Sequence, residues 1–277
     1  FVGSEGTLGI ITEARLRAHP LPAAERRGAW GYATFEAGLD ACRRILRRGA
    51  TPAVLRLYDA AEAARSFDTS DVAVLLVMDE ADPALVDATF AIVEDECRDA
   101  PERLDDELVG RWWGHRNDVS ALEALTRRGY VVDTMEIAGP WSALPGIYER
   151  TVAALEAVPG TLAATAHQSH AYTDGACLYF TFAAKPEADE RERYYVAAWD
   201  AAQRAVLGAG GALSHHHGVG LNRSRFMAEA LGAGLGVLAS IKQSLDPNGI
   251  LNPGKLGLPD PFGEVSWPGP SGRERNV

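Results

Sequence analysis

The amino-acid sequence predicts an α+β fold, in which helices pack on one face of a β-sheet. Short apolar runs typical of strands alternate with longer segments in which apolar residues recur at helical spacing. Their order is strand–helix–strand, then strand–helix, then strand–helix–strand–strand–helix, and this mixture is typical of the α+β class. We find no internal repeat in the 277 residues.

Each strand is predicted from a short run of aliphatic, β-branched or aromatic residues bounded by turn-forming residues. The clearest run is 72–78, which is continuously apolar and therefore typical of a buried strand. The turn-like residues 172–175 join the last two strands into a pair. The predicted strands are 8–18, 29–35, 53–58, 72–78, 130–138, 161–167 and 176–184.

Each helix is predicted from apolar residues three or four positions apart. In the helix over 82–98, the predicted core positions are Leu85, Phe90 and Val93. The segment 223–245 contains glycines that each weaken a helix by ~1 kcal/mol relative to alanine, so two shorter helices fit as well as one. The predicted helices are 37–48, a short Ala-rich helix after residue 58, 82–98, 105–128, 142–158, 188–207 and 223–245, the last ended by the turn at 246–249.

Composition and charge exclude several classes of protein. The formal net charge of −11 argues against nucleic acid and anionic membranes as partners, although an anionic small molecule needs only a local arginine or lysine cluster. No apolar run approaches the ~20 residues that span a bilayer, and no signal-peptide pattern is present. The three widely spaced cysteines form neither a disulfide framework nor a zinc pattern. We therefore expect a cytoplasmic protein with no transmembrane segment that acts alone or as a homodimer.

The run His215-His216-His217 is the first candidate site. Imidazoles titrate near neutral pH, which suits proton transfer and hydrogen bonding to a developing charge. In extended backbone, His216 would point away from its two neighbours, so one metal ion would not take all three rings. Gly218 and Gly220 follow and would let the backbone approach a ligand closely. The alternative is a polar surface loop without a function, and we predict no metal site.

A second polar cluster lies at 167–172, and five of the seven histidines fall between residues 167 and 217. This concentration favours one site over a random scatter. His167 and His170 have the loose spacing of metal ligands, but no third ligand is evident. Tyr179 lies within a predicted strand, where residue pattern alone favours a core tyrosine with a satisfied hydroxyl over a catalytic one.

The opening residues 1–12 are rich in glycine and hydroxyl side chains and lead into a predicted strand. Such a segment suits backbone contact with the phosphates or ribose of a cofactor, and an ordinary turn fits it equally well. The run 232–236 lacks GxGxxG spacing and follows no strand, so we reject it as a dinucleotide site. Because no GxxxxGK[ST] motif occurs, ATP or GTP chemistry has no support.

Four blocks together resemble a known family. GSEGTLGIITEARL (3–16) resembles the end of the FAD-binding domain of vanillyl-alcohol-oxidase type flavoproteins. LDPNGILNPGKL (245–256) resembles the C-terminal signature of their FAD-linked oxidase branch. SHHHGVG (214–220) and DGACLYFTF (174–182) resemble the alkylglycerone-phosphate synthases of that branch. The resemblance spans nearly the whole chain but is specific only in these blocks.

The resemblance implies an antiparallel sheet flanked by helices, preceded by the last strands of an FAD-binding domain. Residues 1–22 would be the tail of that domain, 23–258 the cap or substrate domain, and 259–277 a loose tail. FAD is the implied cofactor. Since the sequence opens with Phe1 and not Met, we interpret it as the C-terminal portion of a longer protein. The family's Gly-rich pyrophosphate loop would lie in the earlier half, so we expect this portion alone to hold FAD weakly and to be inactive.

The resemblance also implies roles for individual residues. Tyr179 matches the family's catalytic tyrosine, and the three histidines match its active-site histidines. Arg56 matches an arginine near the flavin, and Asn252 would return near the isoalloxazine ring. The opening residues that would line the cofactor are Gly3, Ser4, Glu5, Gly6, Thr7, Gly9 and Ile11.

The residues that would bind the substrate are less well determined. Arg116, Arg127 and Arg128 all lie in the region of the family's phosphate-binding arginine, and none aligns uniquely. We take Arg116, together with His170, as the candidate substrate-binding residues.

Three functions follow from these patterns. The resemblance implies an ether-lipid reaction, in which a lipid precursor forms an adduct with flavin N5 and a fatty alcohol replaces its acyl group without net redox change. Tyr179 would help to remove the substrate proton. The alternative is a flavin-linked 2-hydroxyacid dehydrogenase, although that group usually carries Glu-His-Gly where this chain has His216-His217-Gly218. A third function, of another class, is a non-catalytic binding module that retains the cap fold.

Overall fold

The computed structural model describes residues 1–118, 120–263 and 267–268, apart from the side chain of residue 121. The chain divides into two compact units. The smaller unit combines residues 1–18 with 212–277, and the larger unit is residues 19–211. The predicted domain 23–258 includes parts of both units, and its boundaries stay a prediction. Most of the predicted loose tail lies outside the described residues.

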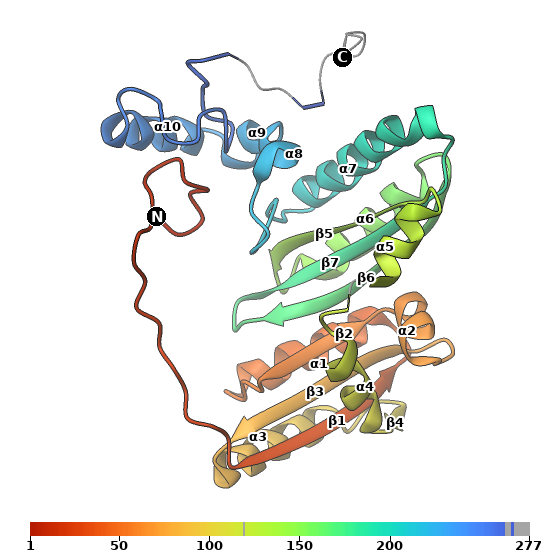
Figure 1. The fold of residues 1–277 in the computed structure, drawn as a ribbon. Helices are drawn as coiled ribbons and strands as arrows, with labels where there is room; N and C mark the ends of the chain where they lie inside the picture. Colours follow the sequence, from red (N-terminus) through yellow and green to blue (C-terminus); the bar gives the residue numbers. More distant parts are fainter. Residues whose placement is uncertain (119, 264–266, 269–277) are drawn as a thin grey trace. The chain divides into compact units, whose positions relative to one another are not determined.

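The larger unit is built on a seven-stranded sheet with the order β4-β1-β3-β2-β6-β7-β5 (Figure 1). All its strand pairs are antiparallel, as predicted from the family resemblance. The strands are β1 (Ala24–Tyr32), β2 (Val54–Tyr58), β3 (Ala73–Ala81), β4 (Glu102–Leu104), β5 (Val131–Pro140), β6 (Thr161–Ala171) and β7 (Gly175–Ala184).

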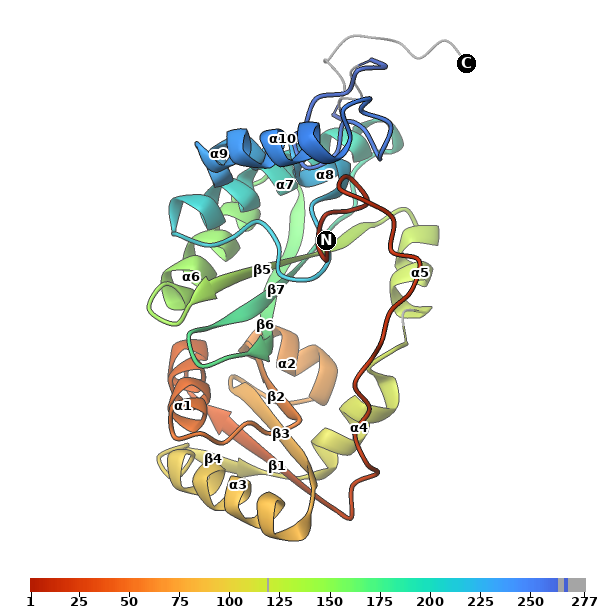
Figure 2. The same ribbon diagram turned by 90° about the vertical axis from the view of Figure 1, so that its left-hand side faces the viewer.

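Four helices cover one face of this sheet. They are α1 (Phe35–Arg47), α3 (Pro83–Glu96), α6 (Leu144–Glu156) and α7 (Arg191–Gly208), the last preceded by the short 3-10 helix η1 (Ala188–Glu190) (Figure 2). Their apolar sides pack on Leu75, Phe180 and Phe182 of the strands and form the main core. Thr34 and Asp82 cap α1 and α3 by accepting a hydrogen bond from a first-turn backbone N–H, as expected for N-cap residues.

Three helices lie on the opposite face, so the prediction of helices on one face only was wrong. They are α2 (Ala60–Phe67), α4 (Glu107–His115) and α5 (Ser120–Arg127) (Figure 2). Apolar residues of α2 and α4 form a second core with Val74, Leu76 and Met78 of β3. Successive side chains of a strand point to opposite faces, and β3 is apolar on both, so both faces need a cover.

Several predicted boundaries differ from the structure. Residues 8–18 form no strand, because a strand requires a hydrogen-bonded neighbour and this segment has none among the described residues. β1 begins five residues before the predicted 29–35, since it pairs along its full length with β3. The predicted helix 105–128 is two helices, α4 and α5. Leu85 is 62% exposed instead of being a core residue, whereas Phe90 and Val93 are buried as predicted.

The smaller unit contains α8 (Gly220–Ser224), α9 (Met227–Leu231) and α10 (Gly234–Leu245). The predicted helical segment 223–245 is interrupted at Gly232, which has a positive φ of 50°. α10 ends at Leu245, and its C-cap residue Asp246 begins the predicted turn. No helix within residues 1–118, 120–263 and 267–268 has the length and apolar character needed to cross a membrane.

Candidate active site

A row of polar and aromatic side chains crosses four neighbouring strands of the larger unit. Tyr58 of β2 is paired with His167 of β6, His167 with Tyr179 of β7, and Tyr179 with Glu136 of β5. Directly paired residues of antiparallel strands point to the same face, so these four side chains lie side by side. Tyr58 belongs to the second core, which places the row on the sheet face that carries α2 and α4.

Three rings of this row form a stack. The centroid of the His167 imidazole lies 5.0 Å from that of Tyr58, with an interplanar angle of 29°. It lies 5.0 Å from the centroid of Tyr179, with an interplanar angle of 8°. These separations are within the range of favourable ring contacts. The stack therefore fixes Tyr179, the predicted catalytic tyrosine, against a histidine.

The imidazole of His167 also contacts a carboxylate from α2. Its Nδ1 lies 2.7 Å from Oε1 of Glu62, and both side chains are 12% exposed. Burial lowers the pKa of His167 and outweighs the opposing effect of the Glu62 charge. At neutral pH the imidazole is therefore uncharged. Because a carboxylate only accepts hydrogen bonds, the proton of the neutral ring is on Nδ1 and Nε2 can accept one.

Helix α2 holds Glu62 in place. The N-cap residue Asp59 accepts a hydrogen bond of 2.7 Å from the backbone N–H of Glu62 and one of 2.6 Å from that of Ala166. Burial raises the pKa of Asp59 to about 6, against the effect of these donors. The hydroxyl of Thr165 donates to Glu62 over 3.3 Å. Burial would raise the pKa of Glu62, but His167 and the nearby Arg65 hold it below its usual value.

Arg56 lies on the same face as the row. Its guanidinium carbon is 5.6 Å from the ring centroid of Tyr58 and 5.2 Å from that of Trp112 on α4. Its Nε donates to the Tyr58 hydroxyl over 3.2 Å. Cation–π contacts of this kind stabilise a cation that is partly withdrawn from water. Arg56, predicted to lie near the cofactor, is thus a fixed positive charge at one end of the row.

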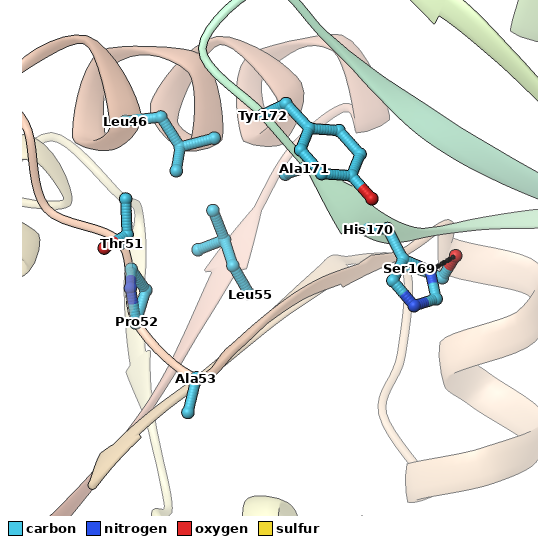
Figure 3. Close-up of a pocket in the computed structure, with 9 residues that line it drawn as sticks. All are labelled: Leu46, Thr51, Pro52, Ala53, Leu55, Ser169, His170, Ala171 and Tyr172. Atoms are coloured by element: carbon cyan, nitrogen blue, oxygen red, sulfur yellow. Dashed lines mark hydrogen bonds between the residues drawn. The ribbon is translucent and has the colours of Figure 1, made fainter. Parts of the chain in front are cut away.

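A small pocket opens where β2 and β6 separate (Figure 3). Its volume is about 150 Å³. β6 has a bulge between Gln168 and His170, and bulges commonly redirect side chains beside functional sites. The hydroxyl of Ser169 lies 3.0 Å from Nδ1 of His170 at the edge of the pocket. The lining residues are mainly apolar: Leu46, Thr51, Pro52, Ala53, Leu55, Ser169, His170, Ala171 and Tyr172.

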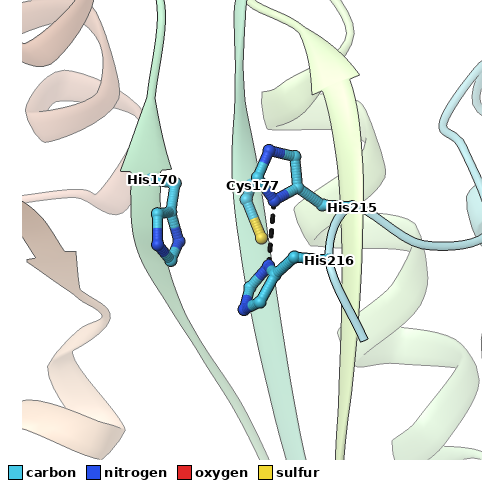
Figure 4. Close-up of side chains that lie close together, drawn as sticks. All are labelled: His170, Cys177, His215 and His216. Carbon is cyan, nitrogen blue, oxygen red and sulfur yellow. Dashed lines mark hydrogen bonds between the residues drawn. The ribbon is translucent and has the colours of Figure 1, made fainter. Parts of the chain in front are cut away.

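Figure 4 shows His170 beside Cys177, its partner in the register of β6 and β7. Within the smaller unit, Nδ1 of His215 lies 2.9 Å from Nδ1 of His216 (Figure 4). The rings of His216 and His217 also touch, with centroids 4.7 Å apart. The expected alternation of these side chains along extended backbone was therefore wrong. The chain bends at each of the three residues, which brings their rings together.

Two sequence blocks at opposite ends of the chain meet in the smaller unit. The buried Nζ of Lys242 donates to the backbone carbonyls of Thr7, over 2.9 Å, and Leu251, over 2.6 Å. It also pairs with the carboxylate of Asp246, which accepts from the backbone N–H groups of Ile250 and Leu251. The C-terminal signature thus binds the opening loop through polar contacts.

The histidine run is attached to the same loop. The carboxylate of Glu5 accepts hydrogen bonds from the backbone N–H groups of Val219 and Gly220. The side-chain amide of Asn252 donates to the backbone carbonyl of Glu5. Glu5 and Asn252 therefore join three of the four sequence blocks, whereas the fourth block forms β7 of the larger unit.

The remaining predicted residues are placed as follows. Gly3 and Gly6 have positive φ angles of 83° and 75°, and the hydroxyl of Thr7 donates to the carbonyl of Ser4 over 2.7 Å. Arg116 follows α4 and lies 3.6 Å from the ring centroid of Trp113, and it is not part of the polar row. Gly9 and Ile11 lie in the segment without secondary structure, where Ile11 is 62% exposed.

The sequence alone does not single out Tyr58, Glu62 or Glu136. It places His167 in the second polar cluster, with the loose spacing of a metal ligand, but gives it no role in the site. The available signal was the alternation along β2, β6 and β7, which places polar residues among apolar ones on one face. The register that aligns them could not be derived from that alternation alone.

A family model described as "FAD linked oxidases, C-terminal domain" matches residues 21–256. An uncharacterized FAD-linked oxidoreductase, YgcU of Escherichia coli K12, is 26% identical over 275 residues, covering 92% of this chain and 56% of the relative. Alkyldihydroxyacetonephosphate synthase of Dictyostelium discoideum is 28% identical, covering 92% and 47%. A probable mitochondrial D-lactate dehydrogenase of Danio rerio is also 28% identical, covering 92% and 53%. The chain spans about half the length of these relatives.

Two solved structures are similar to this chain over most of its length. A structure of alkyldihydroxyacetonephosphate synthase matches with a TM-score of 0.66 and 26% identity, covering 92% of this chain and 49% of that one. A 4-ethylphenol oxidase from Gulosibacter chungangensis has the same TM-score at 14% identity, covering 88% and 55%, and shows similarity of fold alone.

Proposed function

Because the chain belongs to the family of FAD linked oxidases, C-terminal domain, we propose that it is the substrate-side half of an FAD-dependent enzyme. The family and its relatives make FAD the cofactor. The observation that carries the proposal is the polar row on the sheet, since Arg56, His167 and Tyr179 lie on one face of neighbouring strands and belong to neither apolar core. We infer that this face receives the substrate.

The residues present fit FAD. An added Cβ on Gly3 would meet no atom within 4 Å, so a ligand can approach the backbone of the opening loop closely. Bound FAD supplies an electron-accepting ring beside which the substrate reacts. In the smaller unit, the residues that we propose to hold it are Gly3, Ser4, Glu5, Gly6, Thr7, Gly9, Ile11 and Asn252. For the larger unit, we keep the prediction that Arg56 is a flavin-side arginine.

We propose that the reaction resembles that of alkyldihydroxyacetonephosphate synthase, which exchanges an acyl for an alkyl group in ether-lipid synthesis. Tyr179 would help to remove the substrate proton as its phenolate. In the smaller unit, the histidine run would hold or move a proton. The contact between His215 and His216 supports this role, because one Nδ1 must donate while the other accepts. His170 at the pocket edge, and Arg116 directly after α4, would bind the substrate.

The second candidate function is a flavin-linked 2-hydroxyacid dehydrogenase, favoured by the similarity to the Danio rerio protein. A non-catalytic binding module is the remaining alternative. We also infer that the protein works in the cytoplasm, which three buried, unbridged cysteines support. A homodimer stays a prediction.

Purification of the full-length protein tests the proposal through its visible flavin absorbance. A yellow protein supports the flavoenzyme, and a folded protein that cannot be loaded with FAD contradicts it. Bleaching of the flavin by 2-hydroxyacids would select the dehydrogenase, and exchange of an acyl for an alkyl group without net bleaching would select the synthase-like reaction. Tyr179→Phe should lower kcat by roughly 100-fold or more, the contribution typical of a positioned proton-transfer group. Unchanged turnover in Tyr179→Phe would favour another base.

A further inference from the structure

The hydrogen bond between His167 and Glu62 restrains more than His167 itself. The imidazole plane is fixed by three contacts, the bond from Nδ1 to Glu62 and the stacks on Tyr58 and Tyr179. Turning the imidazole would break the bond to Glu62. Because the Tyr179 ring lies within 8° of the imidazole plane, the orientation of Tyr179 depends on the same bond.

Glu62 is itself restrained. Its backbone belongs to the first turn of α2, which Asp59 caps, and its second carboxylate oxygen accepts from Thr165. Arg65 donates in turn to the Thr165 hydroxyl over 2.7 Å. These contacts hold the Glu62 carboxylate against Thr165 of β6. The carboxylate therefore has little freedom to follow a displaced imidazole.

A buried polar pair is a poor device for stability alone. Removing two polar groups from water is costly, and an apolar pair of similar volume is often as stable or more so. His167 stacks on Tyr58 of the second core, and Glu62 precedes Ala63 of the same core in α2. A function other than stability therefore explains the pair better.

We propose that Glu62 and His167 form a positioning pair that orients the Tyr179 ring and controls the charge next to its hydroxyl. The proposal rests on the role of Tyr179 under the proposed function. The neutral imidazole of His167 donates its Nδ1–H to Glu62, and protonation at Nε2 would keep this bond and place an imidazolium against the Tyr179 ring. Such a cation favours phenolate over phenol.

The charge state of His167 depends on groups from several elements. Glu62 favours the imidazolium, whereas burial and the Arg56 charge oppose it. As pH falls through the His167 pKa, which lies below the usual 6.5, the ring becomes charged. The titratable and charged groups around the pair are Arg56 and Tyr58 of β2, Asp59 before α2, Glu62 and Arg65 of α2, Tyr179 of β7, Glu136 of β5 and His170 of β6.

The test uses two variants of the full-length holoenzyme. In Glu62→Leu/His167→Phe, an apolar pair keeps the packing and the ring stack but removes the titration. We expect unchanged flavin absorbance, a KM within about two-fold of wild type and a kcat lowered roughly 10-fold. The plot of kcat against pH should also lose the acid limb that His167 contributes. In Glu62→Gln, the amide oxygen still accepts from Nδ1–H, so kcat stays within about three-fold. That acid limb moves to lower pH, because the carboxylate charge that favours the imidazolium is gone.

A second measurement does not depend on turnover. The phenol pKa of Tyr179 is obtained from ultraviolet difference spectra against Tyr179→Phe in each background. We expect both variants to lower the phenol pKa by at least half a unit, because each removes the Glu62 carboxylate charge that disfavours phenolate. A wild-type kcat profile together with an unmoved phenol pKa in both variants would overturn the proposal. An enzyme that fails to bind FAD or to turn over substrate contradicts the proposed function, whereas the phenol titration still reports on the pair.

Discussion

The two units hold their candidate residues by different means. In the larger unit, the polar row stands on a sheet whose two faces are covered by apolar cores. In the smaller unit, the opening loop and the C-terminal signature are joined mainly by hydrogen bonds to Lys242, Glu5 and Asn252. Apolar burial is spread over many contacts, whereas each polar contact has a defined partner. Single substitutions should therefore act locally in the larger unit and disrupt a whole loop in the smaller one.

Lys242→Met should have the largest effect. It removes donors from two carbonyls and leaves the Asp246 carboxylate without its cation, and breaking a buried pair in this way is strongly destabilising. We expect proteolysis within residues 1–18 and 246–258 to become several hundred-fold faster, roughly the scale of a lost buried pair. Time-resolved digestion with mass spectrometry measures it. Lys255→Ala is the matched control and should change the rate less than about two-fold. Equal rates for both variants would refute the proposed difference between the units.

Asp59 provides the test in the larger unit. Its folded pKa of about 6 exceeds the ordinary 3.8, so the folded state binds the proton more tightly than the unfolded state. Stability from this group is fully present below pH 3.8 and is lost as pH rises to about 6, a change of about 3 kcal/mol.

The measurement is urea unfolding between pH 4 and pH 6.5 of wild type and Asp59→Asn. The variant should lack the fall in unfolding free energy that Asp59 causes over this window. It should also be less stable at every pH, because an amide cannot accept from both Glu62 and Ala166. Asp82→Asn, at the N-cap of α3, is the control and should leave the slope unchanged. A variant with the wild-type slope would show that the trend arises elsewhere.

Gly218→Ala tests how tightly the loop of the smaller unit is held. Gly218 has a φ of 81°, and an added Cβ would lie 2.7 Å from Oε1 of Glu5. A left-handed alanine costs ~1–2 kcal/mol, and displacement of Glu5 from its backbone partners adds to this cost. Gly210→Ala has nearly the same φ, 83°, but no atom within 4 Å of the added Cβ. Chemical denaturation should show a loss greater for Gly218→Ala by about 1 kcal/mol. Equal losses would mean that Glu5 moves without cost.

The sequence predicted local structure better than the site. Helix α1 and strand β2 follow from spacing and composition within a few residues, and the break at Gly232 follows from its own backbone freedom. The second layer of helices was foreseeable from the continuous apolar run of β3, which has no polar face to leave open.

The site depends instead on contacts between distant residues. Tyr58 is paired with His167 only because β2 lies next to β6, and the bond from His167 to Glu62 spans 105 residues. No local pattern encodes such a pairing. The family resemblance identified Tyr179 through its own motif, but it could not identify Glu62, whose neighbours match no block.

The smallest expected effect concerns the pocket beside His170. Ala53 lines it and is exposed, so Ala53→Phe should fill part of the volume of about 150 Å³ without disturbing the core. If the pocket accepts an apolar part of the substrate, KM should rise roughly five-fold for substrates that extend into it, because one buried methylene is worth about 0.8 kcal/mol. KM should stay unchanged for short substrates. Ala91→Phe, on an exposed side of α3, is the control. A uniform rise in KM for short and long substrates would place the apolar part of the substrate outside this pocket. A chain-length dependence would show that the larger unit selects its substrate by a local apolar contact, which a single residue can change without loosening the sheet.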